Sequence, residues 1–185
     1  KEYLMKKGNG IIKSETVRLL GIGESKMAKE VEDLINSGMN PTVAPYAKEE
    51  DVILRITAKA ENEGEASKLI APVKKIIKDR FGIKCYAEGE NIKIEEVVGD
   101  LLINKKLTIS TAESCTGGMI ASRLINYPGI SDAFLEGAVT YSNEAKMRTL
   151  KVKKETLDAV GAVSEETARE MALGIAERTG SDISV

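Results

Sequence analysis

The sequence predicts an α+β unit followed by an α/β layered unit, and two patterns support this division. In the first half of the 185-residue chain, strand-like segments rich in β-branched residues are interrupted by two stretches of helical periodicity. Beyond this half, helical and strand-like segments alternate, which is typical of layered α/β domains. The change falls between Glu88 and Ile94, so we predict a linker at 1–10, the α+β unit at 11–91 and the α/β unit at 92–185.

The α+β unit is predicted in the order strand, helix, strand, helix, strand. β-branched residues with partial alternation predict its first strand, and Ser25 is a candidate N-cap for the helix that follows. Pro41 and Pro45 remove backbone N–H donors, so the segment Asn40–Pro45 is predicted as a loop. The five elements are expected at 11–20, 25–38, 51–60, 61–81 and 83–87.

Pro72 lies inside the second helical stretch of this unit. Leu69, Val73, Ile76 and Ile77 form an apolar face at helical spacing around it. Because proline lacks the N–H that a helix requires and its ring crowds the preceding turn, we expect a kink or a late helix start here.

The α/β unit is predicted to alternate helices with strands. Strands are expected at Leu107–Thr111 and Phe134–Ser142, and a shorter one at Asp182–Val185. Asn143 is a candidate N-cap for one helix and Ser164 for the last helix. The helices are expected at 94–105, 119–127, 144–150, 153–160 and 165–180.

The composition excludes several classes of site. The chain has no histidine, which excludes a Ser-His-Asp triad, a Cys-His dyad and a histidine metal site within it. Its two cysteines lack metal-ligand spacing, and a net charge of -2 gives no strong attraction to nucleic acid. No apolar run approaches the ~20 residues that span a membrane, and no signal-peptide pattern is present. We therefore expect a cytoplasmic protein with no membrane partner.

The stretch from Thr108 to Gly118 is predicted to carry the chemistry. A β-prone run ends there in a turn of small and hydroxylated residues, and a helical pattern follows. This is where α/β proteins tend to place their sites. Ser114 is the candidate nucleophile, and the glycines and the helix start after it could supply N–H donors to an oxyanion or a phosphate.

Without histidine, the base that activates Ser114 must be Lys, Tyr, Asp or Glu. The best candidate is Lys146, because Tyr141 to Lys146 covers the end of the next strand and the start of its helix. Two adjacent strands that each end in such a turn would bring these three residues to one edge of the sheet. An amine acts as a base only when it is neutral, a form that burial favours.

An alternative interpretation of the same residues is purely structural. Ser-Cys-Thr-Gly-Gly at 114–118 could be an N-cap and a closely packed helix start, and Lys146 could be a solvated lysine. The motif is neither GxSxG nor SxxK. Glu113 could orient Lys146 or cap the following helix, and both options remain open. Cys115 is expected to be a small buried thiol.

Three segments of the second unit resemble the C-terminal domain of the CinA family, the nicotinamide-nucleotide amidases. They are TAESCTGG at 111–118, GAVTYSNEAK at 137–146 and GAVSE at 161–165, in that order. Three separated motifs in one order make the resemblance specific, and it implies a CinA C-terminal-like α/β fold.

The first unit resembles the KH-like middle domain of CinA proteins. The matching segments are GIGES at 21–25, NPTVAPY at 40–46 and LRITA at 54–58. Together the two resemblances cover nearly the whole chain and imply a KH-like α+β unit followed by a truncated α/β layered domain.

The resemblance also implies a reaction, the hydrolysis of nicotinamide mononucleotide to nicotinate mononucleotide and ammonia in pyridine-nucleotide salvage. It implies no metal and no cofactor. Ser114 would be the nucleophile and Lys146 its general base, while Tyr141 would assist proton transfer or position the lysine. The residues expected to contact the substrate are Glu113, Thr116, Gly117, Gly118 and Asn143.

Members of this family continue beyond the segment that ends at Val185 and carry another domain before the KH-like one. We therefore expect this chain to be a fragment that is weak or inactive as an enzyme. An unpaired sheet edge in such a fragment would favour a homo-oligomer.

A different function is also compatible with the sequence, namely a binding or structural module linked to competence or DNA damage that has no catalysis. In that case the KH-like unit would contact nucleic acid or a partner domain. The unit lacks a GxxG loop and its charges are mixed, so nucleic-acid binding is the less favoured interpretation.

Overall fold

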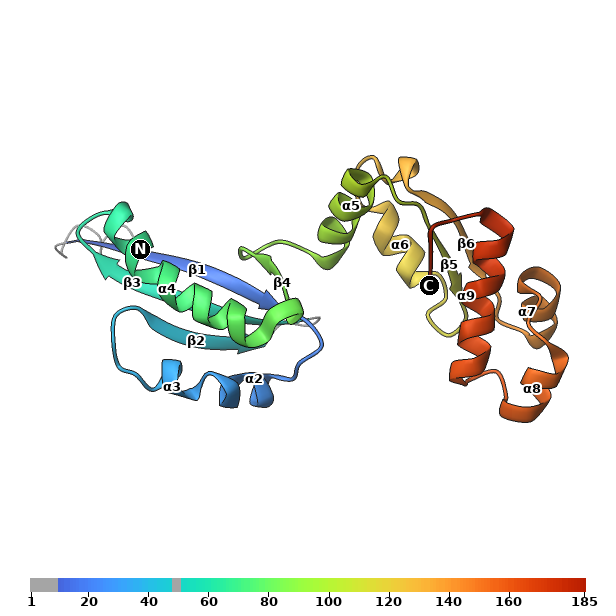
Figure 1. Cartoon of the computed structure of the whole chain (residues 1–185), viewed down its shortest axis with the longest axis horizontal. Coiled ribbons are helices and arrows are strands. Elements are labelled where there is room, and N and C mark those ends of the chain that lie inside the picture. Colours follow the sequence, from blue (N-terminus) through green and yellow to red (C-terminus); the bar gives the residue numbers. More distant parts are fainter. Residues whose placement is uncertain (1–9, 48–50) are drawn as a thin grey trace. The chain divides into compact units, whose positions relative to one another are not determined.

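The structure, a computed structural model, describes residues 10–47 and 51–185 and consists of two compact units (Figure 1). The first unit extends to Ile94 and the second runs from Glu95 to Val185. In the described part of the chain, no helix has both the length and the apolar character that crossing a membrane requires.

The first unit contains an antiparallel sheet with the strand order β2-β3-β1-β4. The strands are β1 (Ile11–Leu19), β2 (Thr42–Ala47), β3 (Val52–Ala60) and β4 (Cys85–Glu88). The helices are α2 (Glu24–Glu30), α3 (Glu32–Ile35) and α4 (Glu63–Phe81), and a short 3-10 helix follows (Gly82–Lys84). The long central pair runs in register from Ile11 opposite Ala60 to Leu19 opposite Val52.

The core of the first unit lies between the sheet and its helices. Helix α4 contacts both β1 and β3, and Figure 1 shows it crossing one face of the sheet. Val17, Leu54 and Ile56 from the strands pack there with Ile70 and Ile77 from α4. The strand residues alternate along their strands, which is why one face of the sheet is apolar. This arrangement confirms the predicted α+β unit.

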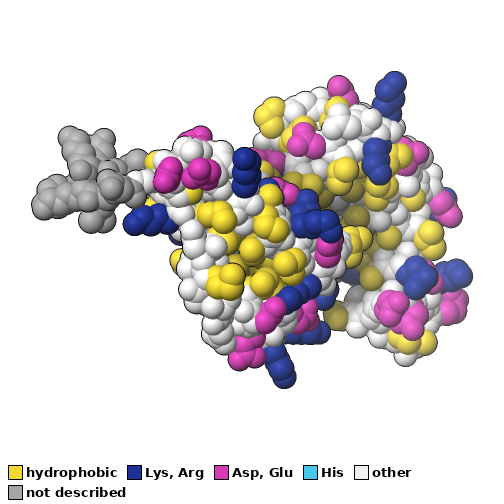
Figure 2. All heavy atoms as spheres, turned by 60° about the vertical axis from the view of Figure 1, so that its left-hand side comes forward, with side chains coloured by type: hydrophobic (Ala, Val, Ile, Leu, Met, Phe, Trp, Pro, Cys, Tyr) yellow, Lys and Arg dark blue, Asp and Glu magenta, His cyan; other side chains and the backbone are white. Residues whose placement is uncertain are grey.

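The exposed surface of the first unit mixes both signs of charge with apolar groups. Figure 2 shows Lys and Arg interspersed with Asp and Glu around a group of hydrophobic side chains. A surface of this kind lacks the basic stripe typical of nucleic-acid readers on the face displayed. Among its described residues, the large apolar side chains that the first unit exposes are Ile12, Leu20, Met39, Tyr46, Ile76 and Ile83.

The predicted loop at Asn40–Pro45 is wrong, because the chain there forms strand β2. β2 pairs only with β3 and lies at the edge of the sheet, where a proline can be accommodated because one side of the strand needs no ladder partner. Pro45 sits opposite Leu54 in this pairing.

Two helix starts in the first unit also differ from the prediction. Ser25 is not the cap of α2, which begins at Glu24 after Gly23 without a side-chain cap. Of the two options expected at Pro72, a kink or a late start, the late start does not occur: α4 begins at Glu63, where the Asn62 side chain accepts a hydrogen bond from the Glu65 N–H at 3.0 Å. A good cap and a long apolar face therefore outweigh the proline.

The second unit contains a parallel sheet with the order β6-β5-β7. Its strands are β5 (Ile109–Glu113), β6 (Phe134–Val139) and β7 (Ile183–Ser184). Its helices are α5 (Ile94–Lys105), α6 (Met119–Ile125), α7 (Asn143–Leu150), α8 (Lys154–Val160) and α9 (Glu165–Thr179), with a 3-10 turn at Ile130–Asp132. This confirms the predicted α/β layered unit.

Two apolar clusters pack on the central strand β5. Ile109 belongs to one cluster with Leu102 of α5 and Leu124 of α6. Ala112 borders the other cluster, which is built from α7, α8 and α9 around residues such as Ile175. Because Ile109 and Ala112 are an odd number of positions apart, they face opposite sides of the strand, and the sheet is covered on both faces.

The helix caps of this unit partly match the sequence pattern. The Ser164 hydroxyl accepts a hydrogen bond from the Thr167 N–H at 3.2 Å and caps α9 as predicted. For α7 the cap is Ser142, whose hydroxyl accepts from the Ala145 N–H at 3.1 Å. Asn143 is instead the first residue of that helix.

Candidate active site

The ends of two neighbouring parallel strands meet in the second unit. β5 ends at Glu113 opposite Val139, the last residue of β6. One residue further on, the Thr140 N–H donates a hydrogen bond to the Glu113 carbonyl at 2.8 Å. The chain segments that leave both strands are therefore held side by side, where α/β folds commonly place chemistry.

Ser114 and Lys146 come together at this edge. Ser114 is the first residue after β5, and Lys146 lies in the first turns of α7. The Lys146 side chain is 0% exposed, and its Nζ lies 3.0 Å from the Ser114 Oγ. The alternative in which Lys146 is a solvated lysine is therefore wrong.

Two backbone carbonyls hold the buried amine. Lys146 Nζ donates to the Thr140 carbonyl at 2.8 Å and to the Tyr141 carbonyl at 3.1 Å. Among the described residues its hydrogen-bond partners are these carbonyls and the Ser114 hydroxyl, and none is a carboxylate. A carbonyl oxygen can only accept, so the two carbonyls fix the direction of two N–H bonds of Lys146. The remaining bonding direction of Nζ then faces the Ser114 hydroxyl.

Glu113 caps the helix that follows the turn. Its side chain is buried, and one carboxylate oxygen accepts from the N–H groups of Gly118 and Ile120, each at 3.1 Å. The other oxygen accepts from the Ala121 N–H at 2.9 Å. Of the two options that the sequence left open, the geometry matches the cap.

These hydrogen bonds keep Glu113 ionised. Burial by itself would raise the pKa of Glu113, but the N–H of Ala121, the hydroxyl of Thr116 and the N–H groups of Ile120 and Gly118 outweigh it. The pKa of Glu113 therefore lies below its usual range. A carboxylate at the start of α6 also interacts favourably with the helix dipole.

The cap changes which backbone donors remain near Ser114. Gly118, Ile120 and Ala121 donate to the Glu113 carboxylate, and the Gly117 N–H donates to the Ser114 carbonyl at 3.0 Å. Within the part of the chain that the structure describes, the N–H groups of Cys115 and Thr116 have no acceptor. The glycines predicted as oxyanion donors are thus engaged, and the two residues directly after the serine keep free donors.

The remaining predicted site residues lie around the serine at its exposed side. Thr116 and Gly117 are exposed, Gly118 is half-buried, and the two glycines have φ of 61° and 95°, which favours glycine. Asn143 is exposed at the start of α7. The Tyr141 carbonyl accepts a hydrogen bond from Lys146 Nζ, while the residue is 77% exposed.

One site residue, Cys115, differs from its prediction, and another, Thr140, was not predicted. Cys115 is exposed, so the prediction of a buried thiol is wrong. Thr140 was not singled out, although its backbone holds both the end of β5 and the lysine. Its role depends on backbone atoms, for which a sequence carries no residue-type signal.

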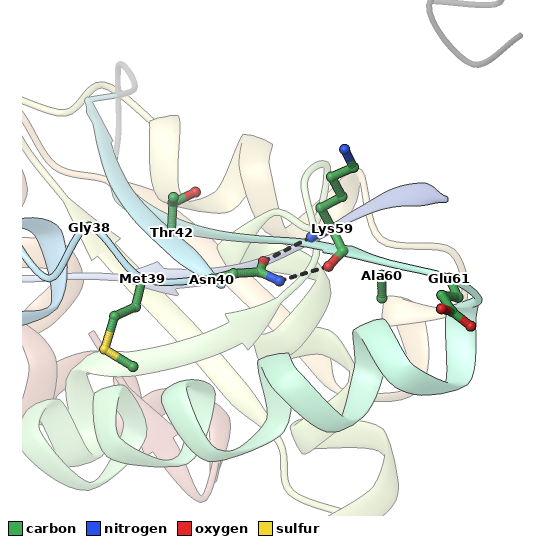
Figure 3. A pocket seen from close by; sticks show the side chains of 7 residues that line it. All are labelled: Gly38, Met39, Asn40, Thr42, Lys59, Ala60 and Glu61. Atoms are coloured by element: carbon green, nitrogen blue, oxygen red, sulfur yellow. Dashed lines mark hydrogen bonds between the residues drawn. The ribbon is translucent and has the colours of Figure 1, made fainter. Parts of the chain in front are cut away.

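A separate hollow of about 510 Å³ lies in the first unit (Figure 3). Its main polar group, the Asn40 side chain, donates to the Lys59 carbonyl at 2.7 Å and accepts from the Lys59 N–H at 2.9 Å. Asn40 thereby lengthens the β2-β3 ladder by imitating a peptide group. The lining residues are Gly38, Met39, Asn40, Thr42, Lys59, Ala60 and Glu61.

Comparisons with known proteins agree with the division into two units. A family model described as the CinA C-terminal domain matches residues 91–185, and one described as the damage-inducible protein CinA KH domain matches residues 14–87. Each matched range contains the sequence motifs described above for that unit.

Several clostridial proteins whose names include the words competence-damage inducible protein are similar along the whole chain. One from Clostridium beijerinckii is 63% identical over 185 residues, which is 100% of this chain and 45% of that protein. One from Clostridium perfringens is 62% identical over 183 residues, or 99% of this chain and 44% of that protein. The chain therefore spans less than half the length of these relatives.

A similar solved structure is that of a competence-damaged protein (CinA) superfamily protein from Escherichia coli. It is 40% identical with a TM-score of 0.48, and the match covers 49% of this chain and 52% of that one.

Proposed function

The chain belongs to the CinA family, and from that premise we propose that its second unit is an amidohydrolase that converts nicotinamide mononucleotide to nicotinate mononucleotide and ammonia. The observation that carries the proposal is the 3.0 Å contact between the buried Lys146 Nζ and the Ser114 Oγ. A hydroxyl and an amine within hydrogen-bond reach are the parts that a histidine-free nucleophile requires.

The first half of the reaction forms an acyl-enzyme. In the neutral form of Lys146, the carbonyls of Thr140 and Tyr141 accept its two N–H groups, so the lone pair faces Ser114. The Ser114 hydroxyl then gives its proton to Nζ while Oγ forms a bond to the carboxamide carbon. When the tetrahedral intermediate collapses, its C–N bond breaks and Lys146 returns the proton to the leaving ammonia.

The second half of the reaction releases the acid. Water attacks the ester carbon, Lys146 takes the proton from that water, and the bond to Ser114 Oγ breaks. The proton returns to Oγ, and the acid formed loses its remaining proton to solvent, so nicotinate mononucleotide leaves as a carboxylate. Each step uses Ser114 or water as the nucleophile and Lys146 as the base.

The intermediate carries a negative oxygen that needs hydrogen-bond donors. The unengaged N–H groups of Cys115 and Thr116 are the donors nearest in sequence to the nucleophile. Backbone amides after the nucleophile serve this purpose in other acyl-transfer enzymes. The exposed Tyr141 hydroxyl would assist proton transfer at the leaving nitrogen, and Asn143 and Thr116 would contact the substrate.

The test is ammonia release from nicotinamide mononucleotide by the chain and by Ser114→Ala. We expect the substitution to abolish release, because among the described residues Ser114 is the only hydroxyl or thiol that Lys146 Nζ reaches by a hydrogen bond. Ser122→Ala is the control, since it removes an exposed serine hydroxyl of α6 and leaves the Ser-Lys pair intact. Measurable ammonia release that is equal in the wild type and in Ser114→Ala would overturn the proposed function, as would a wild type that releases none.

A further inference from the structure

We propose that Glu113 is a positioning residue whose carboxylate holds the nucleophile turn closed, so that the oxyanion donors are restricted to the N–H groups of Cys115 and Thr116. This inference rests on the proposed function and adds to it the role of a residue that does not touch the substrate. It replaces the expectation that Glu113 binds the substrate directly.

The first step of the argument is the engagement of the carboxylate. Both oxygens accept from backbone N–H groups of residues 118, 120 and 121, at 3.1, 3.1 and 2.9 Å. The residue is 2% exposed, so water does not compete for these bonds. A substrate group could reach the carboxylate only by breaking one of them, which argues against direct substrate contact.

The second step is that the backbone of Glu113 belongs to a closed ring with the catalytic pair. Its carbonyl accepts from the Thr140 N–H at 2.8 Å, and the Thr140 carbonyl accepts from Lys146 Nζ at 2.8 Å. Lys146 Nζ in turn reaches Ser114 Oγ at 3.0 Å, and Ser114 is covalently joined to Glu113. A shift of Glu113 would therefore move both the nucleophile and the carbonyl that orients its base.

The third step is the selection of donors. A helix start normally presents several free N–H groups, and these attract anionic groups. Here the carboxylate of the protein itself already occupies three of them. An oxyanion formed at Ser114 is left with the donors of Cys115 and Thr116, which lie between the nucleophile and the capped turn. Neutral glutamine could not serve in the same way, because its NH₂ group would face backbone N–H donors.

The experiment compares the wild type, Glu113→Gln and the control Glu136→Gln, which alters a half-buried glutamate of β6 that pairs with Arg178. The rate of ammonia release gives kcat and KM, and a fluorophosphonate probe measures the reactivity of Ser114. In the labelling step the Ser114 Oγ–P bond forms, fluoride leaves, and the proton passes to Lys146. The amide NMR signals of residues 118, 120 and 121 are followed against pH in the wild type.

We expect Glu113→Gln to lower kcat at least about tenfold with KM changed less than threefold, because binding groups stay in place while the transition-state donors move. Serine labelling should slow in parallel, and the control should match the wild type. In the wild type, the three amide signals should shift together with one apparent pKa below the usual carboxyl range.

Three results would overturn the inference: unchanged kcat and labelling in Glu113→Gln, a loss confined to KM, or three amide signals that do not titrate together. The proposed function fails in a different way, through a wild type that labels at Ser114 but releases no ammonia. In that event the labelling rates and the amide titration still decide the role of Glu113. If Glu113→Gln does not fold, Glu113→Asp takes its place and should lower kcat and serine labelling relative to the wild type, with KM changed less than threefold.

Discussion

Lys146 Nζ lies 3.0 Å from Ser114 Oγ although 32 positions separate the two residues in the chain. The pairing of β5 with β6 explains this proximity, because parallel strands end at the same edge and each is followed by its own turn and helix. The turn after β5 carries the serine, and the helix after β6 carries the lysine. The sheet thus converts two distant motifs into one site.

Lys146→Met should remove the base while keeping a side chain of similar length. We expect kcat for ammonia release to fall by about 100- to 10,000-fold, the usual contribution of a general base. Lys154→Met is the control, because Lys154 is exposed and pairs with Asp158 on the same helix face. A Lys146→Met enzyme with wild-type turnover would refute the assignment of the base.

Tyr141→Phe should separate the two contributions of this residue. The carbonyl that holds Lys146 is unchanged and the lost hydroxyl belongs to an exposed side chain, so the unfolding free energy should change by less than about 0.5 kcal/mol. Ammonia release should fall by about tenfold or more if the hydroxyl assists proton transfer as proposed. Turnover equal to that of the wild type would show that Tyr141 contributes to the site through its backbone carbonyl and not through its hydroxyl.

The stability of the second unit should depend on pH through Glu113. Burial raises the pKa of this carboxyl, yet the hydrogen bonds from the α6 turn hold the pKa below its usual range. Its ionised form therefore stabilises the fold fully above the pKa of the unfolded chain. That contribution is lost as the pH falls through the lower folded pKa.

Acid unfolding of the wild type and of Glu113→Gln, followed by circular dichroism, measures this effect. The difference in stability between the two proteins should be constant near neutral pH and should shrink only in acid. Other carboxyl groups affect both proteins equally and cancel in the comparison. A difference that grows as the pH falls would contradict the assignment.

Gly174→Ala should destabilise the second unit. A Cβ at this position would lie 1.9 Å from the Leu150 carbonyl oxygen at the end of α7. The overpacking penalty of about 1–3 kcal/mol should exceed the helix-propensity gain of about 1 kcal/mol. Because α7 carries Lys146, turnover should fall as well.

Thermal unfolding of Gly174→Ala, with Leu173→Ala as the control, provides the measurement. Leu173 is the adjacent residue of α9 and is 57% exposed, so its truncation should have a small effect. A melting temperature of Gly174→Ala equal to or above that of the wild type would show that α7 and α9 separate easily.

Sequence patterns predicted the strands and helices with strong periodicity, and they indicated the Ser-Lys pair through the absence of histidine. The sequence patterns failed for elements whose structure depends on packing against other parts of the fold. β2 is a strand because β3 offers it a partner, a fact that the prolines of its sequence conceal. Helix α4 continues through Pro72 because its Asn62 cap and its packing on β1 and β3 together outweigh the proline.

The finer parts of the site could not be predicted for a different reason. The Thr140 and Tyr141 groups that hold Lys146 are backbone carbonyls, which every residue type possesses. The choice of Glu113 between a cap and a lysine partner depends on the direction of one side chain, and sequence spacing permits both. Ser142 and Asn143 are both good caps, so the one-residue difference in the start of α7 depended on backbone geometry.

Pro45 also affects whether another extended peptide can pair with the β2 edge of the sheet. As part of an edge strand it contributes no N–H, so the outer rim of the four-stranded sheet offers an interrupted template to any extended peptide. The proline that made β2 hard to predict should thus also make this edge of the sheet a poorer partner for an added strand.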